Sequence, residues 1–437
     1  MEHKPACVND SSVSDRSFRE RKIGIIDYVL TYFAEGMTIV AGVLVYRFAS
    51  TYLHTSGFSE YALARRTIAL IQPVVMAGMS WAIVRQVAVS SAGRTEISGY
   101  TLFAGAALVI GLSHVLLLVM AALFPGVVSQ ILVGSSAFAS LVVPIGVLTT
   151  GISLHLLATS YFRGLLKIGK ANILQILNLG VVPVIVFPLF GSSTQSVLLW
   201  TGGLTSLNSL IVIFSIIIGE AQYPGRLREA IHSLMSYGLP RVPGDLAQMA
   251  ILSLPSYLAA HFVDIEQAGV IAFGCTLLSL AGTAVSPLAI ILLPQASRFL
   301  FDGRREEVRL QVNRFLMVLV PAVLVSLIIG EWLMPVFIQI YLGAAFTKWS
   351  NVVRVIALGA PGYLVFWLLR SIIDAAHHQA TNARNCIIAL ALFLLGSWLL
   401  HPLVDGVYSL LFALVISINA LGFLSLRDAH LILRRSF

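Results

Sequence analysis

The stretch Tyr237-Gly-Leu-Pro-Arg-Val-Pro-Gly-Asp245 places charged and helix-breaking residues at the start of an apolar segment long enough to cross a bilayer. Arg241 and Asp245 lie four residues apart, so on one helix they face the same way and can neutralise each other. The prolines leave backbone carbonyls without donors, and a membrane tolerates such backbone where it is buried in protein or lines a wet cavity. We therefore predict a wall of a solute path, with Arg241 binding an anion and Asp245 coupling to a proton or sodium ion. The alternative is a pair that only packs a broken helix.

Three further ionisable residues fall inside apolar segments. Arg370 and Asp374 repeat the four-residue spacing, so Arg370 is a second candidate for a phosphate and Asp374 for ion coupling. The competing interpretation is that Arg370 only extends to lipid headgroups. Glu35 lies near the middle of the first apolar segment, where an unpaired charged carboxylate is costly. We therefore predict that Glu35 couples to an ion or lines a cavity.

Arg47, Arg65 and Arg66 gather toward one end of the first two apolar segments. They form either a rim that contacts headgroups or a site from which an anionic solute is released. His155 stands between leucines, and a lone histidine of this kind is more often a hydrogen-bonded packing residue than a titrating group.

Composition defines the class of protein. Of 437 residues 58% are hydrophobic and only 11% are charged, which predicts an all-α polytopic membrane protein. Cys7, Cys275 and Cys386 are too far apart in sequence to suggest a disulfide framework or a metal site. No phosphate-binding loop of the Gly-x-x-x-x-Gly-Lys type occurs, so we expect no cofactor and transport driven by a proton or sodium gradient.

Window length predicts about twelve transmembrane helices. A polar tail at 1–23 precedes two six-helix bundles, 24–222 and 223–426, and a second tail follows at 427–437. The apolar segments are 24–50, 62–90, 99–123, 137–162, 171–190, 195–218, 231–262, 268–293, 309–342, 350–376, 384–401 and 406–426.

Basic residues fall in alternate loops, which predicts that both termini are cytoplasmic. This asymmetry also accounts for the net charge of +8 without any nucleic-acid partner. The residues assigned to the cytoplasmic side are Lys4, Arg16, Arg19, Arg21, Lys22, Arg94, Arg163, Lys167, Lys170, Arg226, Arg228, Arg298, Arg304, Arg305, Arg309, Arg384, Arg427, Arg434 and Arg435.

The two bundles match as a weak internal repeat when the second is shifted by about 209 residues. Tyr28 then falls on Tyr237, and Arg85-Gln86 falls on Pro294-Gln295. Because both halves start on the same side, the repeats are parallel, with a pseudo-two-fold axis along the membrane normal and a central cavity between them.

The chain resembles the polysaccharide-flippase branch of the multidrug/oligosaccharidyl-lipid/polysaccharide exporter superfamily over nearly its whole length from about residue 24. The residues that carry the resemblance are Tyr237 to Asp245, Tyr161-Phe-Arg-Gly164, Gly169-Lys-Ala-Asn172, Leu293-Pro-Gln295, and Arg370-Ser-Ile-Ile-Asp374 with the polar loop after it.

The resemblance implies transfer of an undecaprenyl-diphosphate-linked oligosaccharide across a bacterial plasma membrane for O-antigen, capsule or exopolysaccharide assembly, without bond chemistry. The implied partners are this lipid-linked substrate, membrane lipids, a polysaccharide polymerase and a chain-length regulator. In this interpretation Arg241 accepts the diphosphate together with Arg370 and Arg65.

Two other functions compete. A drug/cation antiporter of the same superfamily shares the helix count but is expected to keep its cavity acidic and hydrophobic, whereas intramembrane arginines favour an anionic solute. A membrane enzyme acting on lipid-linked sugar is expected to carry a large outer loop with polar catalytic residues, and the outer loops here are short.

Overall fold

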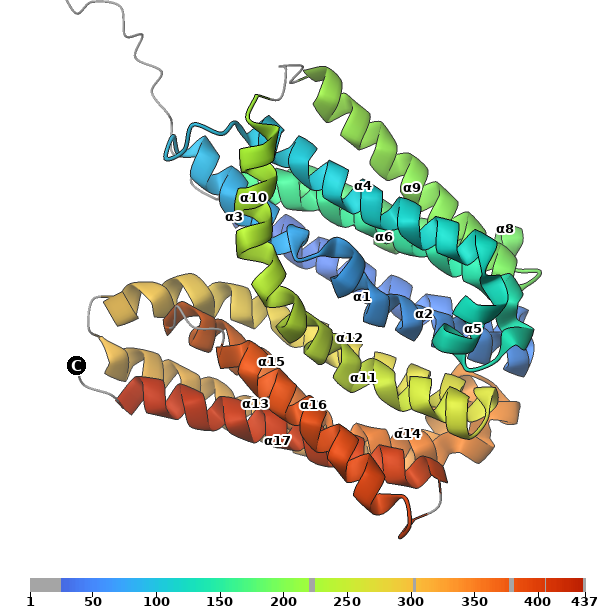
Figure 1. Ribbon diagram of the computed structural model, residues 1–437. Helices are drawn as coiled ribbons and strands as arrows, with labels where there is room; N and C mark the ends of the chain where they lie inside the picture. Colours follow the sequence, from blue (N-terminus) through green and yellow to red (C-terminus); the bar gives the residue numbers. More distant parts are fainter. Residues whose placement is uncertain (1–24, 220–224, 302–303, 377–380, 405, 435–437) are drawn as a thin grey trace, which may run out of the picture.

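The structure is a computed structural model that describes residues 25–219, 225–301, 304–376, 381–404 and 406–434. Every regular element in this part of the chain is a helix (Figure 1). The expected tail at 1–23, the boundary at 222–223 and the side chains of the 293–295 motif lie outside the described residues.

The first half of the chain is built of the helices α1 (Ile25–Tyr52), α2 (His54–Met76), α3 (Met79–Ser91), α4 (Gly99–Leu123), α5 (Pro125–Val133), α6 (Ala139–Gly164), α7 (Ile168–Gln175), α8 (Val182–Phe190) and α9 (Thr194–Gly219). A π-helical turn, η2 (Ile176–Val181), joins α7 to α8, and a short 3-10 turn, η1 (Ser136–Phe138), precedes α6.

The second half contains α10 (Leu227–Gly238), η3 (Leu239–Arg241), α11 (Val242–Phe262), α12 (Ile265–Phe301), α13 (Arg305–Tyr341), η4 (Ala344–Trp349), α14 (Ser350–Ala357), α15 (Ala360–Ala376), α16 (Thr381–Leu400) and α17 (Gly406–Arg434). In Figure 1, α10 crosses from the first half to the second and continues into α11.

The protein is a multi-pass membrane protein. Within the described ranges nine helices are long and apolar enough to span a bilayer, and two bent pairs bring the number to eleven. The remaining expected segment, 231–262, is interrupted at η3. Its α11 part has 21 residues, or roughly 31 Å at 1.5 Å per residue. α17 continues through Arg434, into the segment expected as a tail, because Asp428 accepts hydrogen bonds from Arg384 and Asn385 of α16.

The predicted two-bundle architecture is confirmed, because the order of helices repeats. α6 begins at Ala139 and α14 at Ser350, which is 211 residues later; α9 begins at Thr194 and α17 at Gly406, which is 212 residues later. The repeat is imperfect at two places. α2 and α3 are bent by 46° at residues 77–78, and α14 and α15 are bent by 46° at residues 358–359.

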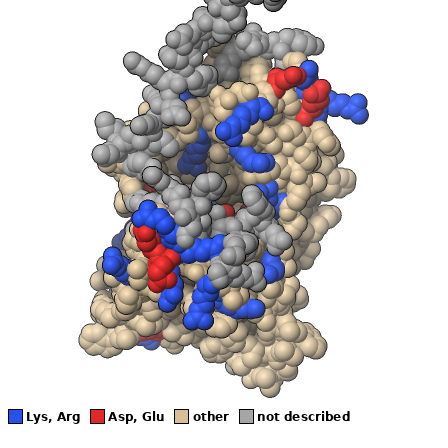
Figure 2. Space-filling model, turned by 90° about the vertical axis from the view of Figure 1, so that its left-hand side faces the viewer, with Lys and Arg blue, Asp and Glu red and all other residues tan. Residues whose placement is uncertain are grey.

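Basic side chains gather at one end of the molecule. The described chain begins and ends at this end, on the left of Figure 1. Figure 2 views this face directly and shows Lys and Arg around a hollowed region between the two halves. We call it the basic end.

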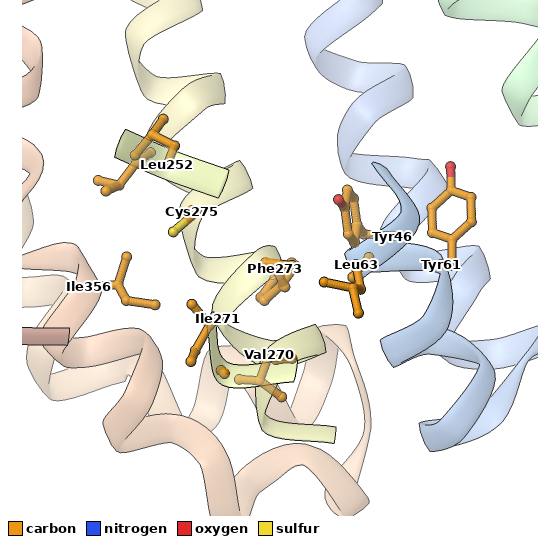
Figure 3. Packing of buried hydrophobic residues seen from close by; sticks show 14 of the residues in the cluster. Tyr46, Tyr61, Leu63, Leu252, Val270, Ile271, Phe273, Cys275 and Ile356 are labelled. Carbon is orange, nitrogen blue, oxygen red and sulfur yellow. The ribbon is translucent and has the colours of Figure 1, made fainter. Parts of the chain in front are cut away.

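The largest apolar cluster in the described part of the chain joins the two halves at the opposite end. There a single cluster joins α1, α2 and α8 to α11, α12, α14 and α17, and Figure 3 shows Leu63 and Tyr46 beside Phe273 across the boundary. Toward the basic end the core divides in two: one cluster lies within α2–α4, α6, α7, α9 and α10, and the other within α12, α13, α15 and α17. The halves therefore separate toward the basic end.

The two main helix breaks contact each other. Ala77 and Gly78 both have positive φ, 47° and 72°, which ends α2 and starts α3 in a new direction. A Cβ on Gly78 would lie 2.2 Å from the carbonyl oxygen of Gly238, at the end of α10. Two glycines are needed because the backbones of the two breaks approach directly.

We predict that Gly78→Ala destabilises the protein more than Gly93→Ala does. Gly93 has nearly the same φ, 70°, but a Cβ there would meet nothing within 4 Å. Its substitution should cost roughly 1 kcal/mol for the left-handed backbone. Gly78→Ala should cost about 1–3 kcal/mol more, because the methyl group overlaps backbone that cannot move aside.

The measurement is thermal unfolding of both variants in detergent. Equal losses of melting temperature in the two variants would contradict the close backbone approach at Gly78.

Candidate functional site

A cavity of about 640 Å³ lies between the two halves and is walled by α2, α3 and α6 on one side and by α11 and α15 on the other. Most of its surface is apolar. Its charged lining residues are Arg65, Asp245, Arg370 and Asp374; its aromatic ones are Trp81 and Trp367; its neutral polar ones are Gln72, Ser80, Gln248 and Ser371.

Arg370 is the most connected group in the cavity. Its guanidinium donates to Oε1 of Gln248 on α11 at 2.8 Å and lies 3.9 Å from the Asp374 carboxylate. It also lies over the rings of Trp81, at 5.9 Å, and Trp367, at 5.6 Å, within the range of cation–π attraction. Arg370 therefore sits between two flat aromatic surfaces, and the structure brings it together with Asp374 as the spacing predicted.

Asp245 does not pair with Arg241. Its carboxylate accepts a hydrogen bond of 3.1 Å from Nε1 of Trp81 on the opposite wall. Among the described residues no cation lies within ion-pair distance of it. The expected neutralising pair on α11 is therefore absent, because Arg241 belongs to η3, outside the regular helix, and its side chain turns back to Tyr237.

Arg241 and Arg85 converge on one aromatic ring. The Arg241 guanidinium lies 3.7 Å from the centre of the Tyr237 ring and donates to the Tyr237 carbonyl oxygen at 2.8 Å. The Arg85 guanidinium, from α3, lies 4.4 Å from the same ring. Both side chains are exposed, and neither forms an ion pair with a described residue. We call Arg85 and Arg241 the arginine pair.

The arginine pair lies on the basic side of the cavity. Arg85 follows Trp81 by four residues along α3, and Arg241 precedes Asp245 by four residues. One helical turn is about 5.4 Å, so both arginines are about one turn closer to the basic end than the cavity lining. A solute that enters the cavity from the basic end must pass them.

Three other predicted residues differ in their surroundings. Arg65 lines the cavity and makes no hydrogen bond or ion pair with any residue that the structure describes. Arg47 is exposed and donates to the carbonyl oxygen of Tyr341 at 2.5 Å, so it joins α1 to α13 outside the cavity. Glu35 is half-buried on α1, has no polar partner within the described ranges, and is not a lining residue.

Arg66, next to the lining residue Arg65, links the two halves. It is 7% exposed, and its guanidinium donates to the Ala272 carbonyl, Thr276 Oγ1 and Ser279 Oγ, all on α12 of the other half. Tyr46 of α1 adds a hydrogen bond to Thr276. In the described part of the molecule no carboxylate compensates this buried charge, and neutral acceptors alone hold it.

Sequence analysis missed the aromatic lining and Arg85. Trp81 and Trp367 lie inside apolar segments, where a tryptophan is usually interpreted as a packing residue. The available signal was the break at Ala77–Gly78 after Pro73, which turns α3 so that Trp81 faces α11. Gln248, one turn after Asp245, was a second signal. His155, as expected, packs in the interior, where its Nδ1 lies 3.4 Å from Asn178.

We predict that Arg66→Met weakens the contact between the two halves at the end opposite the basic end, without unfolding the protein. Thr276 and Ser279 keep hydrogen bonds to their own helix, so the substitution leaves no hydroxyl unsatisfied. Losing hydrogen bonds from a charged donor should shift the equilibrium between closed and open forms by about tenfold or more.

Spin labels at the exposed positions Ser192 and His401, one in each half, would report the change. A longer interlabel distance should gain population in Arg66→Met. Thr67→Ala is the matched control. Thr67 is buried and adjacent to Arg66 in sequence, but its hydroxyl donates a hydrogen bond within its own half, to the Leu132 carbonyl oxygen at 3.3 Å. An unchanged distance distribution in Arg66→Met would refute the assignment.

Comparisons with known proteins bear on the fold. No protein-family model matches the chain, and no curated protein matches its sequence. Among solved structures, the inward-facing conformation of a multidrug resistance MATE family transporter of the MOP superfamily matches with a TM-score of 0.72 at 12% identity, covering 93% of this chain and 98% of that one. Its outward-facing conformation matches with a TM-score of 0.64 at 12% identity, covering 93% and 95%.

The lipid II flippase MurJ, in an inward closed conformation, also matches with a TM-score of 0.72, at 15% identity, covering 94% of this chain and 90% of that one. At such low identities these matches show a shared fold, and the fold is shared with both kinds of transporter. This protein therefore has the two-bundle fold of the MATE transporters and of the lipid II flippase MurJ.

Proposed function

We propose that this protein is a flippase that moves an undecaprenyl-diphosphate-linked oligosaccharide across a bacterial plasma membrane, from the cytoplasmic to the outer leaflet. The observation that carries the proposal is the arginine pair, two guanidinium groups that have no carboxylate partner among the described residues, at the entrance to a cavity between the halves. The solved structures with this fold include both a lipid flippase and drug transporters, and they support transport of either kind equally.

The charges along the path favour an anionic solute. Four arginines lie on it, Arg85 and Arg241 at the entrance and Arg65 and Arg370 in the cavity, against two carboxylates, Asp245 and Asp374. Guanidinium groups bind phosphates through two parallel hydrogen bonds. We propose that the diphosphate first meets the arginine pair and then moves to Arg65 and Arg370.

The remaining lining suits the sugar. Trp81 and Trp367 offer flat faces on which sugar rings can stack, and Gln72, Gln248 and the two aspartates offer hydrogen-bond acceptors for hydroxyl groups. The prenyl chain stays in the lipid between the bundles.

Energy would come from an ion gradient. Asp245 and Asp374 face the cavity, so a proton or sodium ion on either carboxylate would change its charge where the solute binds. Glu35 is a third candidate on α1. An ion biases the transport cycle only through unequal affinity for the two conformations. A polysaccharide polymerase and a chain-length regulator are the partners that would receive the product, and the basic end would face the cytoplasm.

We predict that Arg85→Ala and Arg241→Ala each abolish most transport while the protein still inserts in the membrane. Each loses a charged donor worth about 1.5–3 kcal/mol to a phosphate, or roughly a tenfold to hundredfold loss of affinity. Arg241→Lys should rescue only partly, because an ammonium group lacks the planar fork.

Accumulation of undecaprenyl-linked oligosaccharide in the cytoplasmic leaflet would be measured in cells lacking the protein and in cells complemented with each variant. Arg228→Ala is the control, since Arg228 is exposed on α10, away from the cavity. Normal transport by both arginine-pair variants would remove the basis of the proposal.

A drug/cation antiporter is the second candidate, and one observation favours it. Asp245 and Asp374 face the same cavity as the two tryptophans, an arrangement that also suits an aromatic cation. Efflux of ethidium separates the two functions. Efflux that is lost in Asp245→Asn but kept in Arg241→Ala, with no build-up of lipid-linked sugar in the deletion strain, would establish the antiporter.

A further inference from the structure

A second cavity, of about 360 Å³, lies wholly within the second half, between α13 and a wall made by α12 and the bent pair α14–α15. All of its lining residues are apolar or small except Ser326. Its width comes from residues with little or no side chain, which are Gly274, Ala281, Ala322, Gly330, Ala357 and Ala360. We call this cavity the α13 groove.

The groove exists because the middle of α13 is packed less tightly than its two ends, with Phe315, Leu316, Leu319 and Val323 only partly buried. The buried residues of this 37-residue helix are Val308 and Val312 at one end and Met334 and Ile338 at the other. None of residues 313–333 is buried. Pro321 and Pro335 bracket the unburied stretch that faces the groove, and proline allows a helix to bend away from its neighbours.

A specific contact holds α13 at this distance. Pro335 has no N–H to donate to the carbonyl oxygen four residues earlier, on Glu331. Nε of Arg354, on α14, donates to that oxygen instead, at 2.8 Å. The position of α13 is therefore set by this bond and by the packed ends, and the groove between them is left open.

The chemistry of the groove defines its occupant. An empty apolar space forfeits the dispersion contacts of its walls, and apolar cavities do not hold water. A cavity of about 150 Å³ in another protein binds benzene, so the α13 groove is large enough for part of a hydrocarbon chain. Its walls belong to membrane-spanning helices, so the surrounding medium is lipid.

We propose that the α13 groove binds one acyl chain of a bilayer phospholipid, which acts as a wedge between α13 and the α12–α14–α15 wall. The groove shares no lining residue with the cavity between the halves, because α12 and α15 separate them. The groove lies within the second half and not between the bundles, where the proposed function places the prenyl chain, so we assign the bound chain to a resident lipid.

Photo-crosslinking of the full-length protein in phospholipid nanodiscs tests this. The probe is a phosphatidylethanolamine that carries a diazirine in one acyl chain. Leu278 lines the groove and is only 4% exposed, so it should be labelled only by a chain inside. Trp332 is 81% exposed on α13 and reports the surrounding lipid.

Gly330→Leu should lower labelling of Leu278 about tenfold relative to labelling of Trp332, equivalent to about 1.4 kcal/mol of binding. A Cβ at Gly330 meets nothing within 4 Å, so the leucine fills the groove without a clash. Gly330→Ala gains the same helix propensity but leaves most of the groove open, and it should label as the wild type does.

Three outcomes would overturn the proposal. They are no labelling of Leu278 in the wild type, equal labelling in Gly330→Leu, and loss of labelling on adding unlabelled undecaprenyl phosphate but not unlabelled phosphatidylethanolamine. The last would assign the groove to an isoprenoid chain.

Discussion

The structure depends on a large apolar cluster that joins the two halves at the end opposite the basic end. Burial of Tyr46, Phe58 and Phe273 in that shared cluster holds α1 and α2 against α12, while toward the basic end the core is divided into one cluster of the first half with α10 and another of the second half. Because hydrophobic burial is non-directional, the halves can part at one end without exposing either separate core. The cavity follows from this division, and so does its opening toward the basic residues.

Uncompensated positive charge is the second organising feature. Burying a guanidinium without a carboxylate costs free energy, yet Arg66 is held by neutral acceptors alone. Arg65, Arg85 and Arg241 likewise lack ion-pair partners within the described ranges. Under the proposed function, the anionic solute would compensate the positive charge of Arg65, Arg85 and Arg241 along the path. The carboxylates Asp245 and Asp374 do not neutralise these arginines. Asp245 accepts a hydrogen bond from Trp81 and Asp374 accepts one from Asn382, both neutral donors.

Hydropathy and the spacing of basic loops predicted the helices, their order and the repeat, because a bilayer enforces segment length and backbone satisfaction. The break near Pro240 was visible for the same reason. Pro73 was a signal for the break at Ala77–Gly78, but its exact position could not be predicted, since a glycine in a left-handed turn looks in sequence like one in a helix. The pairing of Arg241 with Asp245 failed because the Arg241 side chain turns back onto the ring and carbonyl oxygen of Tyr237. Arg85 was missed because its role depends on Tyr237, about 150 residues later, and such contacts follow only from tertiary packing.

The two breaks lie where the proposed transport cycle needs the halves to move relative to each other. Gly78 and Gly238 contact through backbone, and the side-chain contacts beside them are Trp81 with Asp245 and Arg85 with Tyr237. Trp81 and the arginine pair lie within about one turn of this contact. A solute that binds Arg241, on the chain leading into α11, and Arg85, on α3, therefore spans the two elements that meet there. A solute that contacts both arginines at once binds more tightly to the conformation that brings them together. Such a difference in affinity is what couples a ligand to a conformational change.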